Sequence, residues 1–368
     1  MPVSTRTSTI PDEQRAGIYN GPHVVTALRI RGAGIAYPML AGQTRFSLGR
    51  HEDCDICVVR PHISHSHALL ERRNGRVRIT DLQSKGGLQV GGSFGGAEGV
   101  TQFDIGPGDS FFIGETEFLA LSDEMQLQRP VVAEILGPQR TADIDELLMK
   151  SVNGPHILFC AEPGCDQERL GGAIHHMSLR RGRDIVPAQP GHPQWHPVPQ
   201  LVAQARHSTL LLRIDAPGAE LDPAFVQALT RPNAGVRVII CAPTLIEAIH
   251  LVTEKLAGGA YRVEIPPLRM RWGEIESLFE RWFIDRQSGY RFSDFEDKYQ
   301  AALKAYRWPE NLEELRDVAD TLIQLAPYAS SRKAEEAGVM PKTNINRWLA
   351  KLGLKMPLLR ESSADSAK

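Results

Sequence analysis

Cysteine and long apolar runs are both scarce in this sequence. The chain has 368 residues and five cysteines, too few for a disulfide framework in a chain of this length. No apolar run approaches the ~18 residues that a membrane-spanning helix needs. Residues 1–20 also lack the apolar core of a secretory signal peptide. We therefore expect a cytoplasmic protein without a membrane helix, of a bacterial type.

An excess of either charge sign is also missing. The 42 Lys and Arg residues nearly balance the 44 Asp and Glu residues, and the formal net charge is −2. This balance excludes a uniformly basic nucleic-acid coat and an acidic tail protein. Any nucleic-acid site must therefore be a local basic patch. The hydrophobic fraction of 42% is typical of globular chains, and the length predicts two or three domains.

Three patterns follow one another along the chain. Short β-like runs separated by turn residues fill 23–125 and predict an all-β sandwich. Apolar strand patterns and helix patterns alternate over 143–326, which is typical of an α/β domain, and helices take over from about residue 270. Two short helices around a glycine turn follow at 327–356. The remaining segments 1–22, 126–142 and 357–368 are expected to be a loose tail, a linker and a polar tail.

Three turn-rich segments of the predicted sandwich hold groups that suit a phosphate. They are Leu48-Gly49-Arg50, the run Ile63 to Ala68, and the run Asp81 to Gly87. Each follows a predicted strand, and loops at one edge of a rigid sandwich commonly carry binding residues. An arginine, two serine hydroxyls, a lysine and exposed glycine amides are suited to binding a phosphate oxyanion.

These segments resemble those of a forkhead-associated (FHA) domain, a reader of phosphothreonine peptides, and Gly108 to Leu121 resembles its closing hairpin. The resemblance implies that Arg50 and Ser64 hold the phosphate, that His65 touches the peptide, and that His67 braces the loops. The family usually has an asparagine where this chain has Gly86, and a threonine where it has Lys85. We expect Lys85 to add a phosphate contact. The alternative is an FHA-like scaffold that binds an unphosphorylated partner.

Two other patterns in the same region do not predict a metal site. Cys54-x-x-Cys57 matches half of a zinc site, but no second pair follows at zinc spacing. His62, His65 and His67 are close in sequence, yet no carboxylate or cysteine cluster accompanies them. We therefore expect no metal, and we interpret the cysteines as small side chains within a strand.

The α/β region and its helices resemble the AAA+ ATPase domain of sigma-54-dependent transcriptional activators. The resemblance is carried by Arg237 to Ile240, a core strand, and by Val263 to Arg271, the link into a helical lid. Leu303 to Leu315, with Trp308-Pro309-Glu310-Asn311, resembles the lid motif. The loop by which the family contacts sigma-54 is missing, and a Pro-rich segment at 186–199 takes its place.

The residues that would bind and hydrolyse ATP are replaced. A phosphate-binding loop needs glycines and a lysine, but the matching positions hold Asp166 and Gln167. An aspartate there would repel a triphosphate. Arg213 follows the strand that should end in Asp-Glu, Pro243 replaces the sensor asparagine, and Glu313 replaces the lid arginine. We therefore expect no catalytic residues, no nucleotide cofactor and no remodelling of sigma-54 polymerase, and we favour a module for packing and oligomerisation.

The segment 327–356 has the layout of a helix-turn-helix. Between residues 328 and 360, Lys and Arg number 7 and Asp and Glu number 2, which makes a local basic patch. Such a second helix enters the major groove, where Thr, Asn and Arg read base edges and Lys and Arg touch phosphates. The segment resembles the Fis-type DNA-binding tail of the same activators. The alternative is a two-helix cap on the lid. The second helix of this segment has an apolar face that consists of Ile345, Trp348, Leu349 and Leu352. The polar side chains opposite that face are Lys342, Thr343, Asn346, Arg347 and Lys351.

Together these patterns predict a transcriptional regulator that joins recognition of a phosphothreonine-containing protein to DNA binding. One helix-turn-helix makes few contacts, so a homo-oligomer that reads paired half-sites is expected. The competing hypothesis is an FHA adaptor in Ser/Thr kinase signalling that does not bind DNA. An ATPase is the least supported of the three classes.

Overall fold

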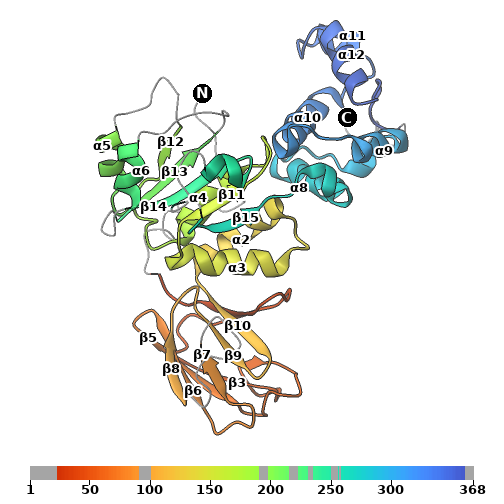
Figure 1. The fold of residues 1–368 in the computed structure, drawn as a ribbon. Coiled ribbons are helices and arrows are strands. Elements are labelled where there is room, and N and C mark those ends of the chain that lie inside the picture. The colour runs from red at the N-terminus through yellow and green to blue at the C-terminus, as the bar shows by residue number, and fades with distance from the viewer. Residues whose placement is uncertain are drawn as a thin grey trace.

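The computed structural model describes residues 23–90, 101–189, 198–214, 223–230, 235–249, 256 and 258–360. The segments 1–22, 190–197 and 361–368, which were expected to be tails or part of a Pro-rich loop, lie outside these ranges. The molecule has three parts in chain order: a β-sandwich at one end, an α/β domain in the middle and a helical region that extends away from it (Figure 1). Within the described ranges, no helix is long and apolar enough to cross a membrane.

The first part consists of two five-stranded sheets packed face to face. Their strand orders are β2-β1-β10-β9-β7 and β4-β3-β5-β6-β8. Side chains alternate along the strands, so that Val77 and Ile79 are buried between more exposed neighbours. The predicted all-β sandwich is confirmed. The strands are β1 (Ala27–Ile30), β2 (Ala36–Pro38), β3 (Arg45–Gly49), β4 (Ile56–Cys57), β5 (Ala68–Arg73), β6 (Arg76–Asp81), β7 (Leu88–Val90), β8 (Gln102–Ile105), β9 (Ser110–Ile113) and β10 (Thr116–Leu121).

The segment 126–142 is not a linker, because most of it is built into helices of the core. α2 (Asp123–Leu136) begins after Ser122, whose hydroxyl accepts the backbone N–H of Met125, and α3 (Thr141–Asn153) follows. Pro130 lies inside α2, where a proline normally weakens a helix. Helical spacing of buried side chains outweighs this local signal: Met125, Val131, Val132, Ile135 and Leu136 all pack into the core.

The second part is a parallel sheet with the strand order β12-β13-β14-β11-β15. β11 and β14 are buried along their whole length, as expected for inner strands of a covered parallel sheet. The predicted alternation of strands and helices is confirmed. Its strands are β11 (Ile157–Cys160), β12 (Val186–Ala188), β13 (Thr209–Arg213), β14 (Arg237–Ala242) and β15 (Tyr261–Glu264), and its helices are α4 (Gln167–Met177), α5 (Val198–Gln204) and α6 (Pro223–Thr230).

The sandwich and the α/β domain are joined by a buried ion pair. Asp145 of α3 accepts the Nε–H of Arg29 at 3.0 Å and the backbone N–H of Gly32 at 2.9 Å. The side chains of Arg29 and Asp145 are 5% and 0% exposed. Ala27 and Leu121 of the sandwich share one apolar cluster with α2 and α3. These contacts fix the sandwich against the α/β domain, so it is not tethered by a flexible linker.

The third part is helical, as predicted from about residue 270. Its core surrounds Trp308, which is fully buried and lies edge-on to Phe279 and Tyr306, with ring centroids 5.8 and 5.1 Å away. Trp308, in the segment that resembles a lid motif, therefore has a packing role in this region. The elements are η1 (Leu268–Met270), η2 (Trp272–Glu274), α8 (Ile275–Asp285), η3 (Phe292–Asp294), α9 (Asp297–Ala305), α10 (Asn311–Leu325), α11 (Ser331–Glu336) and α12 (Lys342–Lys351).

The chain returns to the helical region after α12. Leu358 and Leu359 are buried, and Leu359 pairs with Phe295 in an antiparallel bridge. The backbone N–H of Arg360 donates to the carbonyl of Asp294 at 2.9 Å. Residues 357–360, expected to begin the polar tail, are thus part of the folded structure because they supply two leucines to its core.

Candidate functional site

The loop after β3 and the loop before β5 run side by side at one edge of the sandwich. The backbone N–H of Arg50 donates to the carbonyl of Ser64 at 2.9 Å, and that of His51 donates to the carbonyl of His65 at 3.2 Å. A Cβ on Gly49 would lie 2.1 Å from the carbonyl oxygen of His65, so only glycine permits this approach. The structure therefore brings Arg50 and Ser64, 14 residues apart in the chain, to the same edge.

The loop between β6 and β7 closes against the same place. The hydroxyl of Ser64 accepts the backbone N–H of Lys85 at 3.1 Å. A Cβ on Gly86 would lie only 2.8 Å from the carbonyl oxygen of His62. The asparagine that FHA domains usually have at this position therefore does not fit this loop without a shift of the backbone. Steric crowding explains why glycine stands there.

His67 makes the contacts expected of a residue that braces the loops. Its ring is fully buried, Nδ1 accepts the backbone N–H of Ser64 at 3.0 Å, and Nε2 lies 3.2 Å from the carbonyl of Gly87. This pattern requires a neutral ring with the proton on Nε2. Burial lowers the pKa of His67, which favours the same neutral form. The histidine thus connects two of the three loops.

The groups that would contact a ligand remain accessible. Arg50, His65, Lys85 and Gly86 are exposed and Ser64 is half-buried. Within the part of the chain that the structure describes, the side chains of Arg50 and Lys85 have no hydrogen-bond or ion-pair partner. The ring of His65 stacks on that of His51, with centroids 5.5 Å apart. Arg50 and Lys85 thus supply two cationic side chains on the loops that contact Ser64, and groups of this kind suit a phosphate.

The cysteine pair lies beside these loops. The Sγ of Cys54 is 3.3 Å from the carbonyl oxygen of His65, and the Sγ of Cys57 is 3.7 Å from that of Arg50. Both thiols are free. Among the described residues, no group of three or more His, Cys, Asp or Glu side chains is placed to hold a metal ion. Cys57 lies in β4 and Cys54 in the turn before it, so the pair fills space next to the loops.

The loop after β11, where the sequence resemblance places a nucleotide, is closed by the chain itself. The Nε2 of Gln167 donates back to the carbonyl of Ala161 at 2.9 Å. Arg213, at the end of β13, forms an ion pair with Glu168 of α4. These residues do not fit a nucleotide triphosphate, because the lysine is absent and two carboxylates, Glu168 and Asp166, flank the loop.

The helical region also contacts this loop directly. The Nδ2 of Asn311 donates to the carbonyl of Pro163 at 2.9 Å, and the backbone N–H of Glu313 donates to the carbonyl of Gly164 at 3.2 Å. Gly164 has a φ of +76°, and a Cβ there would lie 2.0 Å from a carbonyl oxygen. The lid and the loop are therefore in close backbone contact.

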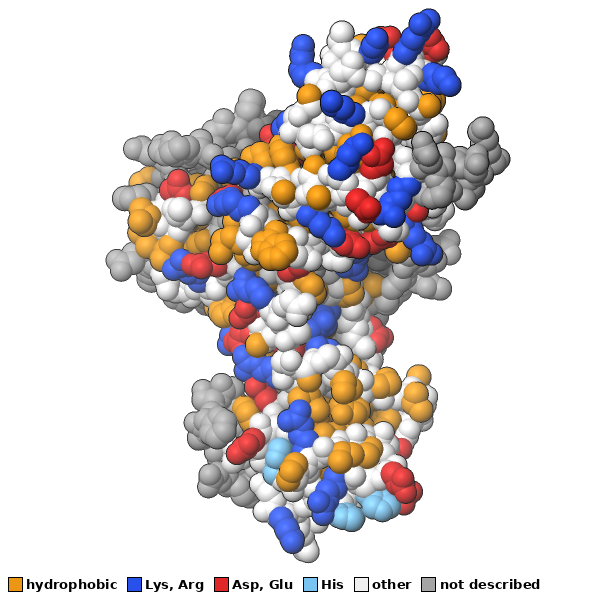
Figure 2. Space-filling view, turned by 90° about the vertical axis from the view of Figure 1, so that its right-hand side faces the viewer, with side chains coloured by type: hydrophobic (Ala, Val, Ile, Leu, Met, Phe, Trp, Pro, Cys, Tyr) orange, Lys and Arg blue, Asp and Glu red, His pale blue; other side chains and the backbone are white. Residues whose placement is uncertain are grey.

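A different set of exposed groups lies on α12. Ile345, Leu349 and Leu352 are buried and Trp348 is half-buried, so the predicted apolar face is the packed one. All five polar residues predicted for DNA contact are exposed: Lys342, Thr343, Asn346, Arg347 and Lys351. At the end of the molecule where α11 and α12 lie, the charged side chains in view are mostly Lys and Arg (Figure 2). This is the surface that would face a nucleic acid.

The five polar residues of α12 differ in their contacts. Across the described ranges, the side chains of Lys342, Thr343 and Arg347 have no polar partner. The Oδ1 of Asn346 accepts the hydroxyl of Ser331 at 2.6 Å, which ties α12 to α11. The sequence alone does not show which polar side chains of a helix already form hydrogen bonds within the protein.

Lys351 has a structural contact where a phosphate contact was expected. Its Nζ donates to Glu314 of α10 at 2.7 Å and lies 5.8 Å from the centre of the Tyr306 ring. The hydrogen bond to Glu314 and a second one to Tyr306 raise the pKa of Lys351 above its ordinary value. Its charge thus links α12 to the lid.

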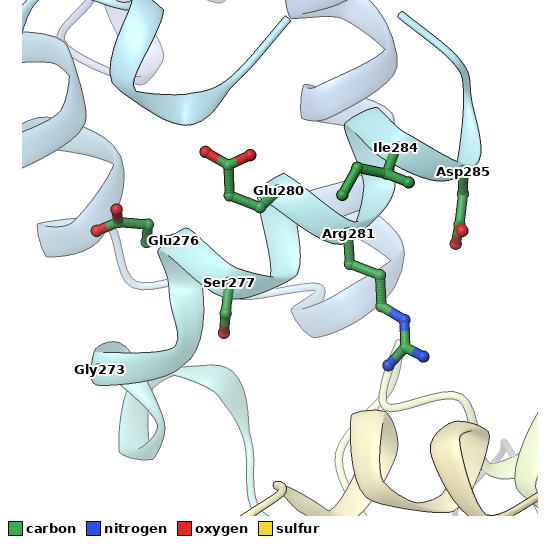
Figure 3. A pocket seen from close by; sticks show the side chains of 7 residues that line it. All are labelled: Gly273, Glu276, Ser277, Glu280, Arg281, Ile284 and Asp285. Carbon is green, nitrogen blue, oxygen red and sulfur yellow. The ribbon is translucent and has the colours of Figure 1, made fainter. Parts of the chain in front are cut away.

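A surface groove lies along α8 (Figure 3). Its lining combines acidic, basic and apolar side chains that point in different directions. Glu280 is engaged through its carboxylate, which accepts the backbone N–H of Phe292 at 2.7 Å. No set of polar groups converges in this groove, and we assign it no ligand. It is lined by Gly273, Glu276, Ser277, Glu280, Arg281, Ile284 and Asp285.

Comparison with known proteins supports the first of these sites. Residues 46–114 match the family model of the FHA domain, so the chain contains an FHA domain. This range holds the three loops with Arg50, Ser64 and Lys85. A search of curated proteins gives no match.

Solved structures are similar to separate parts of the chain. EmbR from Mycobacterium tuberculosis, in complex with a low-affinity phosphopeptide, has 24% identity and a TM-score of 0.24, over 27% of this chain and 24% of that one. NtrX from Brucella abortus, in complex with ADP, has 20% identity and a TM-score of 0.41, over 55% of this chain and 56% of that one. The FHA domain of CT664 from Chlamydia trachomatis has 25% identity and a TM-score of 0.23, over 26% of this chain and 95% of that one. The chain thus spans about a quarter of EmbR and just over half of NtrX.

Proposed function

We propose that this protein is a DNA-binding transcriptional regulator that joins recognition of a phosphothreonine-containing protein, through its FHA domain, to binding of promoter DNA through α12. The observation that carries the proposal is the exposed face of α12. Lys342, Thr343 and Arg347 project from a helix whose opposite face is anchored by Ile345 and Leu349. A helix held in this way presents the types of side chain that read base edges and phosphates in a major groove.

The phosphothreonine function is supported by the match to the FHA family and by the accessible Arg50, Ser64 and Lys85. A phosphate dianion would take charge-assisted hydrogen bonds from the two cations and a further one from the serine hydroxyl. His65 lies where it can touch the peptide, and Gly86 leaves the neighbouring backbone uncovered. As a reader of a kinase signal with DNA as its target, the protein would act in the cytoplasm.

Substitution of the phosphate-binding residues tests this half of the proposal. Arg50→Ala and Ser64→Ala are each expected to weaken binding of a phosphothreonine peptide by about 1–3 kcal/mol, the scale of a charge-assisted hydrogen bond. Isothermal titration with peptides from a phosphothreonine library measures the loss. Arg45→Ala, on the exposed start of β3, is the matched control and should bind as the wild type does. If every phosphopeptide binds no better than its unphosphorylated twin, phosphate recognition is refuted.

The DNA-binding function implies an assembly. A single helix-turn-helix makes few base contacts, and such proteins commonly bind as dimers to half-sites about one turn of DNA apart. We therefore propose a homo-oligomer as the DNA-bound form. We propose that the subunits contact each other through the α/β domain and the helical region, for which a packing and oligomerisation role is expected.

The same proposal includes the absence of ATP hydrolysis. In the described part of the chain, Gln167 is folded onto its own backbone and Arg213 is paired with Glu168, so neither side chain replaces the groups that hold a γ-phosphate and Mg²⁺. Micromolar Mg²⁺-ATP is expected to show no saturable binding in an equilibrium titration. Mg²⁺-dependent turnover by highly purified protein would contradict this expectation.

A second candidate function is an FHA adaptor that does not bind DNA. One observation favours it: the carboxylate of Glu335 accepts the backbone N–H of Lys342 at 2.9 Å, which places a negative charge at the start of α12. The contact of Lys351 with Glu314 would then belong to a two-helix cap on the lid. Titration of labelled duplex DNA at low salt separates the two functions, because an adaptor would not bind.

A further inference from the structure

Four charged side chains, one buried and three partly buried, meet between the α/β domain and the helical region. Glu134 comes from α2, Asp166 from the turn before α4, Arg169 from α4 and Arg316 from α10. Their side chains are 8%, 12%, 14% and 17% exposed, respectively. Two carboxylates and two guanidinium groups balance each other in charge. We call this group the charge cluster.

Each arginine of the charge cluster bridges both carboxylates. Arg169 donates to Glu134 at 2.7 and 3.1 Å and to Asp166 at 3.2 Å. Arg316 donates to Asp166 at 2.8 Å and to Glu134 at 2.9 Å. A fifth charge approaches from α8: Arg281 extends toward α2, and its Nε lies 3.8 Å from a carboxylate oxygen of Glu134 (Figure 3). The result is a closed network that spans the core and the lid.

The network keeps Glu134 ionised. Burial alone would raise the pKa of Glu134, but the hydrogen bonds and charges of Arg169 and Arg316 outweigh it and lower the pKa to about 2. Burial likewise opposes the charge on Arg316, while its bonds to Asp166 and Glu134 raise its pKa. Removing one partner would leave a buried charge uncompensated, which is strongly destabilising.

The charge cluster lies where the sequence resemblance places a nucleotide. Asp166 stands at a glycine position of the phosphate-binding loop, and its backbone is left-handed with a φ of 59°. Glu313 stands at the position of the lid arginine. Arg316, one helical turn further along α10, reaches Asp166 instead. The chain has therefore replaced a site for a nucleotide with an internal contact.

We propose that the charge cluster is a ligand-independent clamp that holds the helical region, and with it α12, in one orientation on the α/β domain. In a nucleotide-binding protein of similar layout, a bound nucleotide would bridge core and lid. Here Arg316 provides that bridge at all times. The side-chain contact of Asn311 and the backbone contact of Glu313 with the loop reinforce it. The clamp does not depend on DNA binding, so its test is independent of the tests of the proposed function.

The direct test removes the lid's contribution to the clamp. In the full-length protein, Arg316→Met is expected to lower Tm by about 5–10 °C and to increase hydrogen exchange in α8 and α10. Arg332→Met is the matched control, because Arg332 forms an exposed pair with Glu336 on α11 and should leave Tm within about 1 °C. An unchanged Tm and unchanged exchange in Arg316→Met would overturn the proposal.

Two further measurements apply if Arg316→Met does not fold. Arg316→Lys keeps the charge but not the forked geometry, and is expected to lower Tm by less than Arg316→Met while still increasing exchange in α10. Addition of Mg²⁺-ATP to the wild type is expected to leave Tm unchanged. If Arg316→Lys has the stability and exchange of the wild type, the forked bridge of Arg316 does not hold the helical region. If nucleotide raises the wild-type Tm by several degrees, the clamp is not ligand-independent. Either result would overturn the proposal.

Discussion

Simultaneous replacement of Lys342, Thr343 and Arg347 by alanine is expected to reduce affinity for a selected duplex by at least about a hundredfold. Each base or phosphate contact of this kind contributes about 1–3 kcal/mol, and three are removed together. The three side chains are exposed and unpartnered within the described ranges, so Tm should not change. Fluorescence anisotropy with a duplex selected from a random library measures the loss. The dependence of affinity on salt should become shallower by about two units, because two cations are lost.

Point substitutions are better suited to this test than removal of the C-terminal segment. Leu358 and Leu359 are buried in the helical region, so a deletion from residue 328 onward would also expose the core. Lys351→Ala is the informative companion variant. Because Lys351 is paired with Glu314, its loss is expected to lower stability, with a smaller effect on DNA affinity than the triple variant has. Equal DNA affinity of the wild type and the triple variant would show that these side chains of α12 do not contact DNA.

Asp145→Ala is expected to destabilise the protein by about 3–5 kcal/mol, because it leaves Arg29 buried without its carboxylate. It also removes the acceptor for the N–H of Gly32. Denaturant unfolding, followed by tryptophan fluorescence and circular dichroism, measures the change. The control is Asp104→Ala, which breaks a half-exposed pair with Arg78 and should change stability little. Similar stability losses in the two variants would show that the sandwich is only loosely attached.

Much of the fold follows from sequence patterns, and the misjudged segments share one cause. The segment 126–142, expected to be a linker, has Pro130 inside α2, and the Pro-rich segment at 186–199 has Pro187 in the edge strand β12. A proline weakens a helix or strand locally, but an edge strand tolerates it, and buried neighbours compensate for it in a helix. Residues 357–360 show the same limit of local patterns: Leu358 and Leu359 are buried, and Leu359 pairs with Phe295, 64 residues earlier.

The candidate sites likewise have some features that the sequence predicts and others that only the structure shows. The meeting of Arg50 and Ser64 was predictable, because their segments carry a recognisable motif. The crowding that requires Gly86, and the engagement of Lys351 by Glu314, depend on distances between separate elements. The pair of Asp166 and Arg316 joins positions 150 residues apart. From the sequence, Asp166 was expected only to disfavour a nucleotide, and the structure adds its contact with Arg316.

A bridging experiment tests the central claim most directly. Biotinylated duplex, selected for binding to the full-length protein, is immobilised, and a fluorescent phosphothreonine peptide is added with or without the protein at low salt. The account predicts that the protein retains the phosphopeptide on the DNA, that the unphosphorylated twin is not retained, and that Arg50→Ala and the triple α12 variant each strongly reduce retention. Phosphopeptide binding in solution by a protein that never binds the immobilised duplex would contradict the account and support the adaptor.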